Sequence, residues 1–172
     1  MICGTMAQIN ILFVCHGNTC RSPMAEALAR HLAAKAGRSD LQFRSAGIAP
    51  RSTGTVADPR AVACIGKRGI DLSGHRVRAL DAAADVKAFD LLLALDGEVF
   101  AVVKERVPAS FAHKVRPLMS FAPGCGVSEV PDPYSGSAAD YDYALGLIER
   151  AIEGILAAPA GALRDVGSPS DL

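Results

Sequence analysis

The chain has 172 residues, of which 50% are hydrophobic and 21% are charged, a composition typical of one globular domain with a substantial core. Lysine plus arginine and aspartate plus glutamate each total 18, so the formal net charge is zero. No overall electrostatic field then favours nucleic acid or an anionic membrane surface, and we expect neither as a partner. Any anion-binding site has to be built locally.

The sequence carries no targeting or membrane signal. No apolar stretch approaches the ~18 residues needed to span a bilayer, and no signal-peptide pattern is present, so we expect a cytoplasmic protein. The five cysteines are odd in number and irregularly spaced, at Cys3, Cys15, Cys20, Cys64 and Cys125. This spacing predicts reduced thiols rather than a secreted disulfide framework, and it does not match a zinc site.

Strand-like and helical patterns alternate along the chain. Strands are predicted near Ile9 to Cys15, Leu41 to Ser45, Asp90 to Ala94 and Lys114 to Leu118. Helices are predicted at 22–36, 58–68, 97–107 and 138–157, and the last of these has an apolar face that should pack against the sheet. Alternation of this kind predicts a parallel sheet with helical crossovers.

The predicted fold is therefore α/β. It is a single-domain, doubly wound sandwich with a four-stranded parallel sheet in flavodoxin-like order 2-1-3-4, and a phosphate loop joins strand 1 to helix 1. The domain should span residues 9–157, after an N-terminal extension at 1–8. Residues 158–172 are rich in alanine, glycine, proline and serine and are expected to form a disordered tail.

The loop between the first strand and the first helix carries a candidate nucleophile and a candidate anion receptor. Cys15 ends the strand pattern, and Arg21 follows six residues later at the start of the helix. A free thiol has a pKa of about 8.5, but a helix N-terminus and a nearby arginine favour the reactive thiolate. Of the five cysteines, only Cys15 has an arginine at this spacing in a strand–loop–helix context.

The same loop suits a phosphate dianion. Backbone amides from His16 to Ser22 can form a nest, and the planar guanidinium of Arg21 can bind two phosphoryl oxygens. Gly17 permits close approach of the backbone to a ligand, and Asn18 tolerates the left-handed region. These features predict attack by sulfur on a tetrahedral anion.

A candidate general acid lies far along the chain. Asp132 stands between two prolines in EVPDPYSG, and a carboxylic acid there can protonate a departing oxygen. Tyr134 follows and can line a slot for an aromatic leaving group. Taken alone, the same residues also fit an ordinary surface turn. Asp58 and Asp96 are predicted instead to be helix caps.

Five segments occur in order across the chain: CHGNTCRSPMAEA from Cys15, SAG at 45–47, DPRAV at 58–62, DLSGHRVRAL at 71–80 and DPYSG at 132–136. Together they resemble the low-molecular-weight protein tyrosine phosphatases. The resemblance implies phosphotyrosine hydrolysis through a phosphocysteine intermediate, without a metal or other cofactor. Cys15 would be the nucleophile, Arg21 the phosphate ligand and Asp132 the general acid and then the general base.

The resemblance also assigns supporting roles around the loop. Asn18, Ser45 and His75 match positions whose hydrogen bonds hold the loop in its strained shape, and Ser22 matches a hydroxyl that supports the thiolate. Cys20 matches a second loop cysteine that can form a disulfide with an oxidised nucleophile. It can equally be a small packing residue.

The chain departs from the family pattern at the substrate pocket. Counted from SAG without gaps, Arg51 takes the place of a pocket-wall aromatic, which leaves Tyr134 as the aromatic wall. Arg51 can favour acidic residues beside the phosphosite, although a solvated arginine is the simpler interpretation. His16 occupies the position after the nucleophile and can tune the choice of leaving group or lie on the rim without a selective role.

Three other functions remain open from the sequence. A protein arginine phosphatase would use the same Cys15, Arg21 and Asp132, and His16 and Thr19 leave this alternative open. A thiol-dependent arsenate reductase needs two further shuttle cysteines, which LLLALDGEVFAVV lacks. A phosphopeptide-binding module would not need a nucleophile or an acid. The expected partner is a phosphotyrosine-containing protein or peptide, with the chain a monomer or weakly self-associating.

Overall fold

A four-stranded parallel sheet forms the centre of the molecule. The computed structural model describes residues 8–164, and its strands are β1 (Ile9–Cys15), β2 (Leu41–Gly47), β3 (Leu91–Ala94) and β4 (Val115–Pro117). Their order in the sheet is β2-β1-β3-β4, and every pairing is parallel. The predicted fold class and strand order are confirmed.

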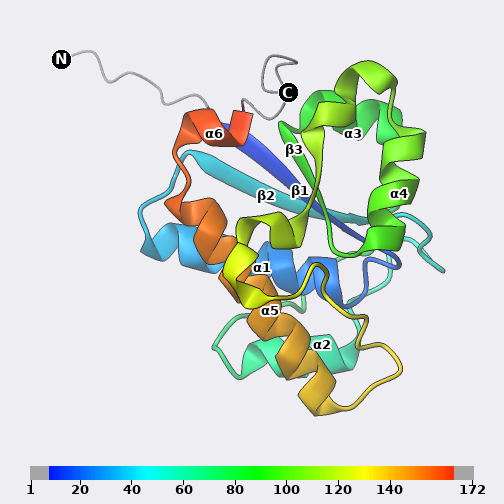
Figure 1. Ribbon diagram of the computed structural model, residues 1–172. Coiled ribbons are helices and arrows are strands. Elements are labelled where there is room, and N and C mark those ends of the chain that lie inside the picture. Colours follow the sequence, from blue (N-terminus) through cyan, green and yellow to red (C-terminus); the bar gives the residue numbers. More distant parts are fainter. Residues whose placement is uncertain (1–7, 165–172) are drawn as a thin grey trace.

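Helices cover both faces of this sheet (Figure 1). One face packs against α1 (Arg21–Lys35), α2 (Pro59–Gly66) and α5 (Ala138–Ala157), and the other packs against α3 (Ala82–Ala88) and α4 (Gly97–Arg106). Side chains alternate along β1, so Ile11 and Phe13 enter the first layer while Leu12 and Val14 enter the second. All four are fully buried, and each such side chain contributes about 1.5–3 kcal/mol on burial.

The helices differ from the predicted ones mainly where local patterns are weak. Helix α3 was not predicted, because AAADVKA has no clear apolar period; Asp81 caps it by accepting a hydrogen bond from the Ala84 amide. Three short 3₁₀ helices were also missed: η1 (Ala109–Lys114), η2 (Leu118–Phe121) and η3 (Pro123–Cys125). The long helix α5 contacts α1, α2 and η2 and completes the core over one face of the sheet.

The predicted disordered tail is wrong for its first part. Residues Ala160–Arg164 form α6, and Leu163 is fully buried in the core cluster that includes Ile9. Arg164 donates a hydrogen bond from Nη2 to the Gln8 carbonyl oxygen at 2.8 Å, so α6 lies beside the start of β1. The rest of the predicted tail, 165–172, and residues 1–7 of the predicted extension lie outside the described residues.

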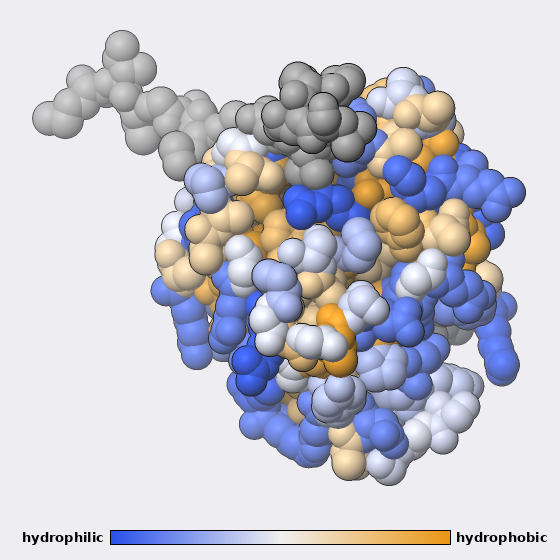
Figure 2. All heavy atoms as spheres, viewed as in Figure 1, coloured by the Kyte–Doolittle hydropathy of each residue, from blue (hydrophilic) through white to orange (hydrophobic). Residues whose placement is uncertain are grey.

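The surface is mixed in character. On the face drawn in Figure 2, hydrophilic residues surround small hydrophobic areas, as expected for a molecule whose apolar side chains fill two internal layers. Within residues 8–164, no helix has the length and apolarity needed to cross a membrane.

Candidate active site

Cys15 is the last residue of β1, at the carboxyl end of the sheet where doubly wound folds bind ligands. Its side chain is buried, with 3% of the residue exposed. The loop that follows is held against the end of β2, because the amides of Ile48 and Ala49 donate to the carbonyl oxygens of Cys15 and His16 at 3.0 and 2.9 Å. Arg21 then begins α1, so the positive end of that helix faces the sulfur.

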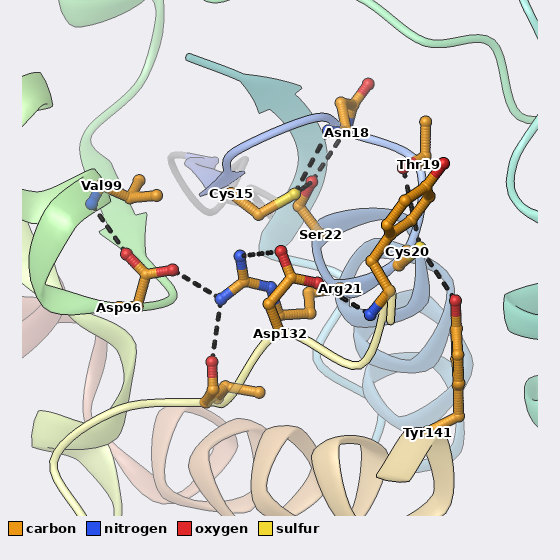
Figure 3. Close-up of polar contacts among 12 residues, drawn as sticks. Cys15, Asn18, Thr19, Cys20, Arg21, Ser22, Asp96, Val99, Asp132 and Tyr141 are labelled. Atoms are coloured by element: carbon orange, nitrogen blue, oxygen red, sulfur yellow. Dashed lines mark hydrogen bonds and ion pairs between the residues drawn. The ribbon is translucent and has the colours of Figure 1, made fainter. Parts of the chain in front are cut away.

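Two hydrogen-bond partners surround the Cys15 sulfur (Figure 3). The Ser22 hydroxyl oxygen lies 3.0 Å from Sγ, and the Asn18 amide donates to Sγ at 3.3 Å. The side-chain amide of Asn18 also donates to the Ser22 oxygen at 2.9 Å. The Ser22 hydroxyl has two acceptors within reach, the Cys15 sulfur at 3.0 Å and the Ala46 carbonyl oxygen at 3.4 Å, and the sulfur is the nearer. The Ser22 hydroxyl and the Asn18 amide can both donate a hydrogen to the sulfur.

Asn18 is the structural centre of the loop. It has a φ of +55°, in the left-handed region that few residues other than glycine adopt, and it is fully buried. Its side chain donates to Ser45 Oγ at 3.0 Å and accepts from the Arg78 amide at 2.9 Å. His75 Nε2 donates to its carbonyl oxygen at 3.0 Å. The structure thus brings Ser45 and His75 onto the same loop residue.

Two residues that the sequence analysis left without a role also support the loop. Glu26, on α1, accepts a hydrogen bond from Ser45 Oγ at 2.6 Å and so fixes that hydroxyl behind Asn18. Gly47 ends β2 directly under the loop, where a Cβ atom would lie 2.8 Å from the His16 oxygen and 2.9 Å from the Asn18 nitrogen. Only glycine fits there without moving the loop, and the SAG segment is the sequence signal for it.

Arg21 is almost fully buried, and its guanidinium donates hydrogen bonds to three acceptors. Its Nη1 donates to Asp96 Oδ2 at 2.6 Å and to the Val130 carbonyl oxygen at 2.9 Å, and its Nη2 donates to Asp132 Oδ2 at 3.1 Å. Burial alone would lower the pKa of this guanidinium, but the charges of Cys15, Asp132 and Asp96 raise it. The arginine is therefore a fixed positive charge beside the nucleophile.

Asp96 has two functions, of which the sequence predicted one. It caps α4 by accepting from the Val99 amide at 2.7 Å through Oδ1, as expected. Its other oxygen binds Arg21, which orients the guanidinium from the side of β3 (Figure 3). The second role depends on a contact across 75 residues of sequence, and no local pattern indicates it.

The candidate acid stands at the open side of the site. The Asp132 side chain is 48% exposed, whereas that of its partner Arg21 is 3% exposed. The Tyr134 amide donates to Asp132 Oδ1 at 3.1 Å, which fixes the turn through Pro133. Asp132 is therefore open to solvent while its partner Arg21 is not.

A pocket of about 370 Å³ opens over these residues. Tyr134 and Arg51 both line it, and the Arg51 guanidinium carbon lies 5.9 Å from the centroid of the Tyr134 ring. The lining also includes Cys15, His16, Gly17, Thr19, Cys20, Arg21 and Asp132. A larger hollow of about 650 Å³ lies behind the loop and is lined by Glu26, Ser45 and His75, but not by the nucleophile.

The remaining cysteines of the described chain differ in their surroundings. Burial raises the pKa of the Cys20 thiol, and its sulfur lies 3.3 Å from the Tyr141 hydroxyl oxygen. Burial also raises the pKa of Cys64, on α2, to about 11, and Cys125 lies in η3. Cys64 and Cys125 do not line the 370 Å³ pocket.

Comparison with known proteins decides the family. The model of the family described as low molecular weight phosphotyrosine protein phosphatase matches residues 10–164. The chain belongs to this family. Membership agrees with the strand order and with the loop that ends at Arg21.

Relatives of this phosphatase family cover most of the chain. A low molecular weight protein-tyrosine-phosphatase of Streptomyces coelicolor is 38% identical over 152 residues, which span 86% of this chain and 92% of that protein. The crystal structure of YfkJ from Bacillus subtilis has a TM-score of 0.83 at 31% identity, and covers 90% of this chain and 96% of that one.

A structure with a different printed activity is also similar. A mutant of the YwlE arginine phosphatase, solved with a phosphorylated active-site serine, has a TM-score of 0.78 at 30% identity and covers 86% of this chain and 93% of that one. YwlE is a Bacillus subtilis protein. The chain is therefore also similar in structure to a protein that is named an arginine phosphatase.

Proposed function

We propose that this family member hydrolyses phosphotyrosine in proteins or peptides through a phosphocysteine intermediate. One observation carries the proposal: the Cys15 sulfur, the Arg21 guanidinium and the Asp132 carboxyl line a single pocket whose wall includes the Tyr134 ring. This set supplies a nucleophile, a phosphate ligand, an acid and an apolar surface for an aromatic leaving group. The family relationship supports the same activity.

In the first step the Cys15 thiolate attacks phosphorus in line with the departing phenolate oxygen. Arg21 and the loop amides bind the three equatorial oxygens, whose negative charge is spread in the transition state. Asp132 gives its proton to the phenolate oxygen as the P–O bond breaks. In the second step Asp132 takes a proton from water, which attacks the phosphocysteine and releases phosphate. Ser22 stabilises the departing thiolate by its hydrogen bond.

Phosphoarginine is the second candidate substrate, because the YwlE structure shares this fold at 30% identity. Tyrosine is favoured here because the Tyr134 ring lines the pocket and is 46% exposed, so it can stack on a substrate ring. Parallel assays on phosphotyrosine and phosphoarginine proteins separate the two substrates. A higher kcat/KM on phosphoarginine would overturn the tyrosine assignment but keep the shared catalytic residues.

The covalent mechanism predicts separate phenotypes for the nucleophile and the acid. Cys15→Ser should abolish turnover, and undiminished turnover would exclude the phosphocysteine route.

Asp132→Ala should lower kcat by about 10²–10³-fold with phenyl phosphate, whose leaving group is basic, and by much less with p-nitrophenyl phosphate. Equal losses on both substrates would show that Asp132 is not the acid.

A further inference from the structure

Arg60 contacts both halves of the active site, although it lies on α2 and does not line the pocket. On one side it forms a two-pronged ion pair with Asp58, from Nε to Oδ1 at 3.0 Å and from Nη2 to Oδ2 at 2.8 Å. The Asp58 amide in turn donates to the Thr19 carbonyl oxygen at 2.9 Å. Arg60 is therefore anchored to the phosphate loop through Asp58.

The other side of Arg60 holds the loop that carries the acid. Its Nη1 donates to the Tyr134 carbonyl oxygen at 2.7 Å. The Tyr134 amide donates to Asp132 at 3.1 Å, and Asp132 accepts from Arg21 at 3.1 Å. Thr19 and Arg21 are two residues apart in the chain. The contacts therefore form a closed ring that runs from the phosphate loop through Asp58 and Arg60 to the acid loop, and from Asp132 back to Arg21.

The upstream end of the acid loop has its own anchor. Val130 is fully buried; its amide donates to the Leu95 carbonyl oxygen at 2.8 Å and its carbonyl oxygen accepts from Arg21. Asp132 thus lies between two arginine-bound carbonyl groups, those of Val130 and Tyr134. The downstream bond, made by Arg60, is the more exposed of the two.

Arg60 also lies against two aromatic rings. Its guanidinium carbon lies 5.3 Å from the centroid of the Tyr134 ring and 5.2 Å from that of the fully buried Tyr141 ring. Hydrogen bonds from Arg60 hold the pKa of Asp58 below its usual value, so the pair is charged at neutral pH. Isolated surface ion pairs contribute little, but a two-pronged geometry with fixed neighbours is the exception.

We propose that Arg60 is a positioning residue: it sets the place of the general acid Asp132 relative to the phosphate loop by bridging Asp58 and the Tyr134 carbonyl group. The proposal rests on the proposed function, because it concerns the acid of that reaction. Arg60 acts only through Asp132 and Tyr134. Its removal should impair proton transfer to the leaving group more than phosphate binding.

The test compares leaving groups in the full-length protein. Arg60→Gln should lower kcat about tenfold with phenyl phosphate and phosphotyrosine peptide, whose leaving groups have a pKa near 10, and less than twofold with p-nitrophenyl phosphate. KM should change little, since Arg21 and the loop amides still bind the phosphate. Arg60→Lys, which keeps the charge but not the fork, should recover part of the loss.

Two further variants separate positioning from general destabilisation. Asp58→Asn keeps the α2 cap but weakens the ion pair, so it should show the same leaving-group dependence as Arg60→Gln, and the double variant should lose less than the product of the two. Lys67→Gln breaks another exposed ion pair of this region, with Asp142, and should leave kcat unchanged with all three substrates.

The outcomes are distinct. If the wild-type protein hydrolyses aryl phosphates, and Arg60→Gln lowers kcat equally on all of them or on none, the role of Arg60 is overturned and the proposed function stands. A wild-type protein without turnover on any aryl phosphate would overturn both. A loss confined to basic leaving groups, at an unchanged melting temperature, supports the positioning role.

Discussion

The two sides of the active site are built in different ways. On the phosphate-binding side, Asn18 and Ser22 are fully buried and Cys15 is 3% exposed; the contacts there are short hydrogen bonds between buried groups. On the leaving-group side, the Asp132 side chain is 48% exposed and Tyr134 is 46% exposed, and arginine side chains from other elements hold the loop.

The difference follows from what each side does. The phosphate dianion is the same in every substrate, so its site can be rigid, and a buried polar group left without its partner costs about 1–3 kcal/mol. The leaving group and its flanking residues vary, and an exposed ion pair contributes only about 0–1 kcal/mol. We therefore expect substitutions on the buried side to abolish activity, and substitutions on the exposed side, apart from those of the acid Asp132 itself, to adjust it.

Among the substitutions that test this comparison and leave Cys15 and Asp132 in place, Gly47→Ala should have the largest effect, because it changes the buried side directly. The added methyl group would collide with the backbone of His16 and Asn18 and displace the loop amides, so kcat should fall by about 10²-fold or more. Binding of vanadate, measured by calorimetry, should weaken in parallel. Gly146→Ala in α5 is the matched control, since its Cβ meets no atom within 4 Å. Normal turnover by Gly47→Ala would show that the loop is not rigid.

An intermediate effect is expected where the two sides meet, at Asp96. Asp96→Asn keeps the α4 cap, since asparagine caps as well as aspartate, but it removes the charge that orients Arg21. We expect kcat to fall about tenfold and the melting temperature, measured by calorimetry, to fall by a few degrees, because the buried Arg21 loses a charged acceptor. Asp96→Ala should lose more stability, because it removes the α4 cap as well. The control, Asp81→Asn, changes the cap of α3 alone; a loss of activity there would contradict the role of Asp96.

How much of the buried side could be predicted from the sequence depends on whether its residues are contiguous in the chain. Cys15, Arg21 and the loop between them could be located from the sequence because strand, loop and helix are contiguous, and Asn18 and Ser22 lie within them. The role of Glu26 and the second role of Asp96 could not, because each acts across a packing contact that has no local pattern. Gly47 belongs to the SAG segment, but its close approach to the loop is visible only in the structure. Helix α6 was missed for the same reason: its burial rests on Leu163 alone.

The exposed side shows the same limit. Tyr134 and Arg51 could be proposed as pocket walls by counting from DPYSG and SAG, and both line the pocket. Arg60 lies inside the DPRAV segment, yet nothing local shows that it reaches the Tyr134 carbonyl oxygen 74 residues away. Long-range contacts made by surface side chains are therefore the part of this site that needs the structure.

The smallest effect is expected at the pocket mouth, where Arg51→Ala removes an exposed charge. Arg51 lines the pocket beside Tyr134, so an acidic residue next to the phosphotyrosine can approach it. We expect the ratio of kcat/KM for acidic-flanked over neutral-flanked phosphotyrosine peptides to fall about threefold in the variant, as an exposed pair worth about 0.2–1 kcal/mol implies.

High salt should reduce the same ratio in the wild-type protein, because screening acts on exposed charges and much less on buried ones. Arg44→Ala is the control: this arginine is 65% exposed on β2 and does not line the pocket. If neither Arg51→Ala nor salt changes the ratio, then Arg51 does not select for acidic residues beside the phosphotyrosine. Selectivity then depends on the Tyr134 ring that lines the pocket. If the ratio falls in Arg51→Ala and not in Arg44→Ala, the exposed side adjusts substrate choice while the buried side keeps the chemistry constant.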